Sequence, residues 1–128
     1  MKFLCMVFVD EAKLDALSPQ ESQALDDISL AYDFTLRQQG HFLAAQALQS
    51  VRTAAVVRIC DGKVKVTDGP FAEAREHVGG FILIEARNRD EAIEVASRIP
   101  AIQLGGIEVR PVKELVASTD LPRPDPSL

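Results

Sequence analysis

Residues 81–84 read Phe81-Ile82-Leu83-Ile84 and are apolar at every position, directly after the pair Gly79-Gly80. The amino-terminal stretch from Phe3 to Val9 is apolar throughout as well. A strand with one face in water alternates apolar and polar side chains, so these two stretches predict strands that are buried on both faces and lie centrally in a sheet. Residues 107–112 alternate instead, which is typical of a strand at a sheet edge.

A long helix is predicted over residues 19–39. Ser18 can cap its amino terminus, Pro19 fits its first position, and Glu21 completes a capping box. Gly40 supplies the left-handed residue at which such a helix stops.

Two apolar stripes run along this helix. One has the spacing of a single helical face, which we expect to pack on the sheet: Leu25, Ile28, Tyr32 and Leu36. Leu30 and Phe34 lie on nearly the opposite side, where a simple surface helix needs no apolar residues. We expect this second stripe to contact the tail or another subunit.

Two more strand-like stretches, residues 42–48 and residues 51–60, follow the helix. Asp61-Gly62 is a two-residue hairpin signal, and residues 63–66 alternate between lysine and valine, so a partly solvent-facing hairpin is predicted here. A second helix is predicted after Asn88, which forms another capping arrangement with Glu91. Its buried face consists of Ala92, Val95, Ala96 and Ile99, and Pro100 follows it.

Without the hairpin of residues 51–67, the elements follow the order strand, helix, strand, strand, helix, strand. This is the order of the ferredoxin-like split βαβ unit, in which the first and third strands are central. The predicted fold is therefore α+β: a ferredoxin-like βαββαβ domain over residues 1–113 with an inserted β-hairpin. An extended carboxy-terminal tail is predicted over residues 114–128.

Helices on one face of this sheet would leave its other apolar face in water, and that surface needs a cover. The simplest cover is a second copy of the same sheet, so we expect a homodimer with sheets packed face to face, or a barrel formed between subunits. Coverage by the carboxy-terminal segment of the same subunit is the competing explanation.

Composition narrows the class of protein. The 128 residues carry a net charge of −5, and the lysines and arginines are scattered, so nucleic acid is not an expected partner. The amino-terminal apolar run is too short to span a membrane, and we expect a cytoplasmic protein. Cys5 and Cys60 lie in apolar strand-like runs and are expected to be small buried residues. With no Cys/His cluster, we expect no metal site.

Several stretches, in this order and spacing, resemble the YCII-related family that carries the Asp-Gly-Pro-Phe (DGPF) motif: Val66–Glu73, Gly79–Ala86, Glu91–Pro100 and Ile107–Val112. The resemblance covers nearly the whole chain up to about residue 115. It implies a dimeric ferredoxin-like α/β barrel of bacterial origin without an established biochemical activity. It also implies a genetic neighbourhood that often includes extracytoplasmic-function sigma factors, and a His/Asp pair as the basis of the enzymatic role suggested for distant relatives.

Asp68 and His41 are the candidate catalytic residues. Asp68 can act as an acid, a base or a ligand-binding group, or it can accept backbone N–H groups in a turn. His41 has the intrinsic pKa range of a general base, yet it also follows a helix carboxy terminus, where a cation is favoured. Three residues are candidate ligand-binding groups: Gln46, Arg52 and Tyr32. Tyr32 can equally be a core residue, and Arg52 a solvated one.

Gln46 departs from the family, since similar proteins usually have glutamate at this position. An amide cannot titrate, so any acid or base role of that carboxylate is lost here.

Two functions remain open at this stage, and the sequence does not decide whether the protein is an enzyme. The first is a small-molecule binder or enzyme that needs no cofactor and has a pocket around Asp68 and His41. The second is a non-catalytic regulatory or interaction dimer that acts with a sigma factor through Leu30, Phe34 and the tail.

Overall fold

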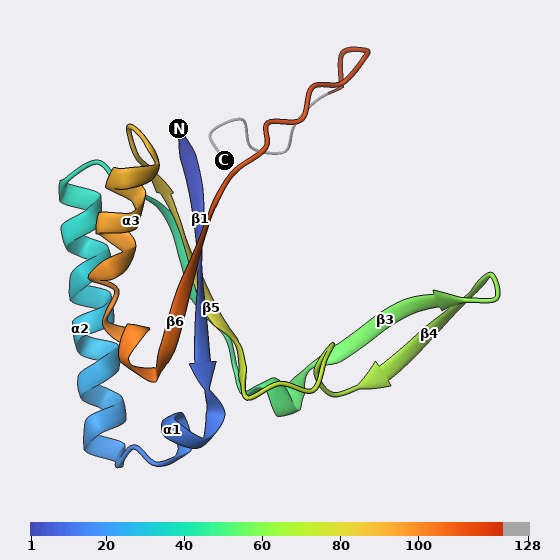
Figure 1. The fold of residues 1–128 in the computed structure, drawn as a ribbon, viewed down its shortest axis with the longest axis horizontal. Helices are drawn as coiled ribbons and strands as arrows, with labels where there is room; N and C mark the ends of the chain where they lie inside the picture. Colours follow the sequence, from blue (N-terminus) through green and yellow to red (C-terminus); the bar gives the residue numbers. More distant parts are fainter. Residues whose placement is uncertain (122–128) are drawn as a thin grey trace.

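The computed structural model describes residues 1–121. Four strands form an antiparallel sheet in the order β2-β5-β1-β6, and α2 and α3 lie on one face of it (Figure 1). The elements are β1 (Lys2–Asp10), α1 (Glu11–Asp15), α2 (Pro19–Gln38), β2 (Phe42–Ala47), the 3-10 helix η1 (Val51–Thr53), β3 (Ala55–Cys60), β4 (Lys63–Asp68), β5 (Glu76–Glu85), α3 (Arg89–Ser97), the 3-10 helix η2 (Pro100–Leu104) and β6 (Gly105–Pro111). The two doubly apolar stretches are the central strands β1 and β5, which confirms the α+β ferredoxin-like prediction.

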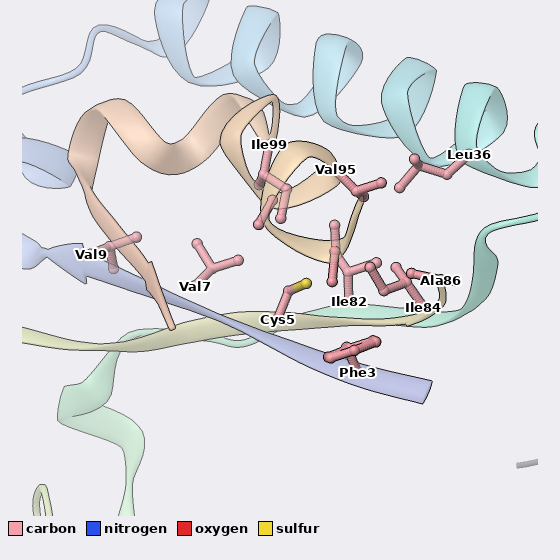
Figure 2. Close-up of a cluster of buried hydrophobic side chains, with 12 residues drawn as sticks. Phe3, Cys5, Val7, Val9, Leu36, Ile82, Ile84, Ala86, Val95 and Ile99 are labelled. Atoms are coloured by element: carbon pink, nitrogen blue, oxygen red, sulfur yellow. The ribbon is translucent and has the colours of Figure 1, made fainter. Parts of the chain in front are cut away.

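The core lies between the sheet and the helices. Phe3, Cys5 and Val7 of β1 are buried on this side, next to Ile82 and Ile84 of β5 (Figure 2). The helices contribute Leu36, Ala92, Val95 and Ala96. Each fully buried large aliphatic or aromatic side chain stabilises the fold by roughly 1.5–3 kcal/mol, so this layer accounts for the attachment of the helices to the sheet.

The opposite face of the sheet, called the open face below, is apolar as well. On it Leu4 pairs with Leu83, and Met6 pairs with Phe81; these side chains are half-buried within one chain. Residues 114–121 of the tail are exposed, so up to residue 121 the tail does not pack over this face. The homodimer that would cover it stays a prediction. The tail predicted beyond residue 121 lies outside the described residues.

Helix α2 begins and ends as its sequence predicts. The Ser18 hydroxyl accepts the Glu21 N–H at 3.1 Å, and the Glu21 carboxylate accepts the Ser18 N–H at 3.0 Å. Gly40 takes the left-handed conformation that stops the helix, with φ of 81°. The prediction for Ile28 is wrong, because 52% of this residue is exposed whereas Leu36 is 1% exposed. Each four-residue step advances the helix by about 40° beyond a full turn, so Ile28 has rotated away from the face that Leu36 buries.

The inserted hairpin stands apart from the sheet as a two-stranded arm made of β3 and β4. Asp61 and Gly62 form its tip with positive φ values of 52° and 74°, which confirms the predicted turn. The single strand predicted at residues 51–60 is wrong in its first part. Ser50 caps the short helix η1, and Thr53 donates its N–H to the Ser50 carbonyl at 2.9 Å, so β3 starts only at Ala55.

The two cysteines differ in their environment. Cys5 is buried in the core, and this burial raises its thiol pKa to about 11. Cys60 is exposed beside the arm's tip, so the expectation that it is buried is wrong. The error follows from the arm, which leaves its apolar side chains outside the core of the chain.

Candidate functional site

A cavity of about 460 Å³ lies between α2, the edge strand β2 with its neighbour β5, and η2. Its floor includes three small residues on the helix side of the sheet, Ala45, Ala47 and Gly80, of which Ala47 pairs with Gly80 and Ala45 pairs with Ile82. A Cβ atom at Gly80 would lie 2.8 Å from the Gln46 carbonyl oxygen, so only glycine fits there. Because the floor carries short side chains, α2 stands above a hollow at this end of the sheet instead of a packed core.

The inward face of α2 is polar above this hollow. Ser29 and Asp33 line the cavity and are half-buried, in a stripe that continues through Leu36 into the core. Partial burial raises the pKa of the Asp33 carboxyl, and the nearby Arg37 guanidinium opposes that rise. Asp33 is therefore a carboxylate held partly out of water at the wall of a mainly apolar cavity.

Tyr32 also lines the cavity, and its hydroxyl donates to the Val95 carbonyl oxygen at 2.6 Å. Burial raises the pKa of this phenol, so it stays protonated and keeps the hydrogen bond. The bond ties α2 to α3 across the core. Tyr32 thus combines the two roles considered for it, since its ring is a core residue and also forms part of the cavity wall.

Asp68 and His41 do not meet within one chain. Asp68 ends β4 and pairs with Ala55 at the base of the arm. His41 precedes β2, with its Nδ1 atom 2.8 Å from the Glu85 carbonyl oxygen. These positions lie beyond opposite ends of the six-residue strand β2, which spans about 20 Å at the usual rise of 3.3 Å per residue. The pocket predicted around both residues is therefore not formed by a single chain.

The other predicted ligand-binding residues divide between two places. Tyr32 lines the cavity, and Gln46 borders it, but Gln46 pairs with Phe81 and so directs its side chain to the open face. Arg52 lies in η1, where its guanidinium contacts the Asp15 carboxylate at 3.3 Å, and it is not part of the cavity lining. Within residues 1–121, no group of three His, Cys, Asp or Glu side chains is arranged to hold a metal ion.

Ser29 and Asp33 are among the site residues that sequence reasoning missed. The available signal was the position of both residues between Leu25 and Leu36 on the inward side of α2, where a packed core would require apolar side chains. A polar residue on the buried stripe of a helix indicates either a satisfied core group or a cavity. The small residues of the facing sheet decide between a satisfied core group and a cavity. These residues lie close to α2 in space but far from it in sequence.

A family model described as the YCII-related domain matches residues 1–116. The chain belongs to the YCII-related family. An uncharacterised protein of Rhizobium meliloti strain 1021 is 31% identical to this YCII-related chain over 115 residues, which cover 88% of the chain and 92% of that relative.

The YCII-related chain is also similar in fold to a solved structure. This is 5-chloro-2-hydroxyhydroquinone dehydrochlorinase (TftG) from Burkholderia phenoliruptrix AC1100, in complex with 2,5-dihydroxybenzoquinone. The TM-score is 0.53 and the sequence identity is 16%, with 88% of this chain and 94% of that chain covered. The likeness supports the ferredoxin-like fold. Within the described residues 1–121, no helix is both long and apolar enough to cross a membrane.

Proposed function

We propose that this YCII-related protein binds a small organic molecule in the cavity under α2. The observation that carries the proposal is the half-buried Asp33 carboxylate on the wall of a cavity of about 460 Å³. Binding sites for small molecules are concave, mostly apolar and supplied with a few convergent polar groups, and their volumes are roughly 300–1,000 Å³. The pocket proposed here differs from the one expected around Asp68 and His41, although it keeps Tyr32.

The polar lining defines the chemistry of the ligand. Asp26 and Asp33 contribute carboxylates and Ser29 contributes a hydroxyl, while the residues of 1–121 that line the cavity include no lysine, arginine or histidine. Such a wall attracts hydrogen-bond donors and repels anions. The ligand we propose is uncharged or cationic, has an apolar body, and carries at least one hydroxyl or amine group.

A proton-transfer reaction would use the same carboxylate. Desolvation disfavours the charged form of Asp33, which makes its carboxylate a stronger base than one in water. A ligand hydroxyl that donates to Asp33 would be positioned to lose its proton to it, with no cofactor required. The TftG structure, similar in fold, holds 2,5-dihydroxybenzoquinone, a small ring compound with hydroxyl groups.

The test compares small molecules that differ in their hydrogen-bond donors. It also compares two protein variants in which the substituted carboxylate lies inside or outside the cavity. Hydroquinone, catechol and tyramine are titrated against the protein, with 1,4-dimethoxybenzene as the probe without donors and benzoate as the anionic probe. We expect binding by the first group, seen as shifts of the Ala45 and Gly80 amide signals in NMR spectra. Asp33→Asn should weaken that binding about 10–100-fold, because a hydrogen bond to a charged group contributes roughly 1.5–3 kcal/mol.

Asp27→Asn is the matched control, since Asp27 is an exposed carboxylate on the same helix and does not line the cavity. It should bind the probes like the unsubstituted protein. If benzoate binds better than hydroquinone, or if Asp33→Asn and Asp27→Asn bind equally well, the proposed site is wrong.

An interaction module is the second candidate function. Leu30 and Phe34 are 67% and 58% exposed, as expected of a surface that meets a protein partner. An extracytoplasmic-function sigma factor is the partner that we propose for this alternative. Phe34→Glu should then abolish co-purification with the sigma factor, whereas Asp33→Asn should leave it unchanged. The opposite pattern would favour the ligand-binding function.

A further inference from the structure

A second cavity, which the proposed function does not use, lies where α3 and η2 face the edge strand β6. We call it the α3 groove, and its volume is about 410 Å³. Ile93 and Ile102 are 40% and 37% exposed, so the groove leaves apolar surface in water. Five apolar residues line it: Ile93, Ala96, Ile102, Ile107 and Val109.

Strand β6 presents free backbone groups along this groove. It pairs with β1 alone, because it is the last strand of the sheet. The Val112 N–H donates to the Lys2 carbonyl oxygen at 2.9 Å, and bonded residues alternate along an antiparallel strand. Residues 106, 108 and 110 therefore bond to β1, whereas Ile107 and Val109 direct their N–H and C=O groups outward. A free edge of this kind is a template for a further strand.

One charged side chain at the groove has no partner within the described chain. Arg89 begins α3 and lines the groove one turn before Ile93. Every other arginine of residues 1–121 makes an ion pair or a ring contact, and Arg89 makes neither. Glu108 also lines the groove, but its carboxylate accepts the Arg110 Nε–H at 2.9 Å. The groove therefore carries one uncompensated positive charge.

We propose that the α3 groove binds an extended peptide segment of another protein, which adds to β6 as an antiparallel strand. Hydrogen bonds to the outward groups of Ile107 and Val109 hold its backbone. Side chains opposite these two residues lie on the same side of the sheet, so they enter the groove. The groove side of α3 spans about 12 Å from Arg89 to Ser97 at roughly 1.5 Å per residue, which matches about four residues of a strand.

The direction of the segment follows from the ends of the strands. Lys2 pairs with Glu85, and Phe3 pairs with Pro111, so α3 begins at the end of the sheet where β6 finishes. A segment antiparallel to β6 starts at this end, beside Arg89. Its first groove-facing residue is therefore acidic, and the next two groove-facing residues are apolar.

The edge strands of a second copy would not supply such a segment. Strand β2 contains no acidic residue. Glu108 of β6 pairs with Met6, so its side chain lies on the open face and not on the side of the groove-facing residues. Neither edge would place a carboxylate at Arg89, and this unpaired charge favours a segment from another protein.

A designed peptide and its methylated form test the backbone contacts. The probe is acetyl-Glu-Thr-Val-Thr-Val-Thr-amide, whose Glu and Val side chains share one face of a strand. In NMR titrations of the isotope-labelled protein, it should shift the amide signals of Ile107 and Val109. The same peptide with both valines N-methylated lacks the donors that face β6, and it should bind about tenfold more weakly or worse, because two hydrogen bonds are lost.

Substitutions at the groove test the side-chain contacts. Arg89→Gln, or Gln in place of the peptide's Glu, should each weaken binding about two- to fivefold, as expected of an exposed ion pair. The two changes together should weaken it no more than either alone. Ile93→Glu places a charge in the apolar groove and should abolish binding. Val116→Glu is the control, because Val116 is 91% exposed and does not line the groove.

Three results would overturn the proposal. The first is equal binding of the methylated and the unmethylated peptide. The second is the absence of any shift of the Ile107 and Val109 signals at millimolar peptide. The third is a shift of these signals with protein concentration when no peptide is present, since this would assign the β6 edge to a second copy of the chain.

Discussion

Two leucines of α2 test how the helix is held on the sheet. Leu36 is 1% exposed and Leu30 is 67% exposed, so Leu→Ala at these positions removes the same atoms from a packed core and from a surface. A buried Leu→Ala change lowers the free energy of unfolding by about 2–5 kcal/mol, because the protein loses the transfer free energy of the removed atoms and also contains a new cavity. The surface change should cost less than about 0.5 kcal/mol.

For Leu36→Ala we expect a value in the upper half of that range. The side chain lies among residues of the sheet and of α3, where Ile84 and Ala96 are 0% and 4% exposed, and a rigid neighbourhood of this kind cannot collapse into the space. Since a chain of 128 residues is stable by roughly 6–19 kcal/mol, the loss would be a large part of the total.

Urea unfolding followed by circular dichroism measures both variants, at one protein concentration because association adds to apparent stability. The midpoint should fall for Leu36→Ala with an unchanged slope. A loss below about 1 kcal/mol at Leu36, or equal losses at both positions, would show that α2 does not pack on the sheet as described.

Two further predictions concern the amino terminus and the inward face of α2. Ser18→Ala removes the hydroxyl that accepts the Glu21 N–H at 3.1 Å, and it should destabilise the protein by about 0.5–2 kcal/mol in the same urea assay, whereas Ser18→Asp should retain most of the cap. A loss within error for Ser18→Ala would refute that role of the hydroxyl. The pKa of Asp33 is higher in the folded protein than in the unfolded chain, so ionisation of this carboxyl opposes folding. As the pH rises, the unfolded chain releases this proton first. The free energy of unfolding therefore falls between the unfolded and the folded pKa. Asp33→Asn should therefore be more stable than the unsubstituted protein at pH 7, and this advantage should disappear near pH 3; an advantage that is constant with pH, or absent, would contradict the burial of this carboxyl.

The fold could be predicted from sequence where its causes are local. The capping box of Ser18 and Glu21 depends on residues three apart, and the Asp61-Gly62 turn needs only its own backbone conformation. The order of the strands followed from the apolarity of β1 and β5, because a central strand is covered on both sides whatever its partners are. Local chemistry and side-chain burial therefore gave the ferredoxin-like arrangement without any knowledge of contacts.

The candidate site could not be predicted in the same way. Asp68 and His41 are candidates only by chemical type, and the chain places them beyond opposite ends of β2. Asp33 gains its importance from Ala45 and Gly80, which leave space beneath it and are distant in sequence. Such a cavity forms where short side chains of one element face another element. The periodic pattern of a single helix or strand does not show which residues face it.

The contrast between the two thiols gives the molecule a built-in labelling position. Cys5, with its pKa of about 11 and its place in the core, is almost entirely protonated at neutral pH and shielded from reagents. Cys60 is exposed beside the hairpin tip. A maleimide dye or a nitroxide spin label added to the unmodified protein should therefore attach at residue 60 without prior removal of any cysteine.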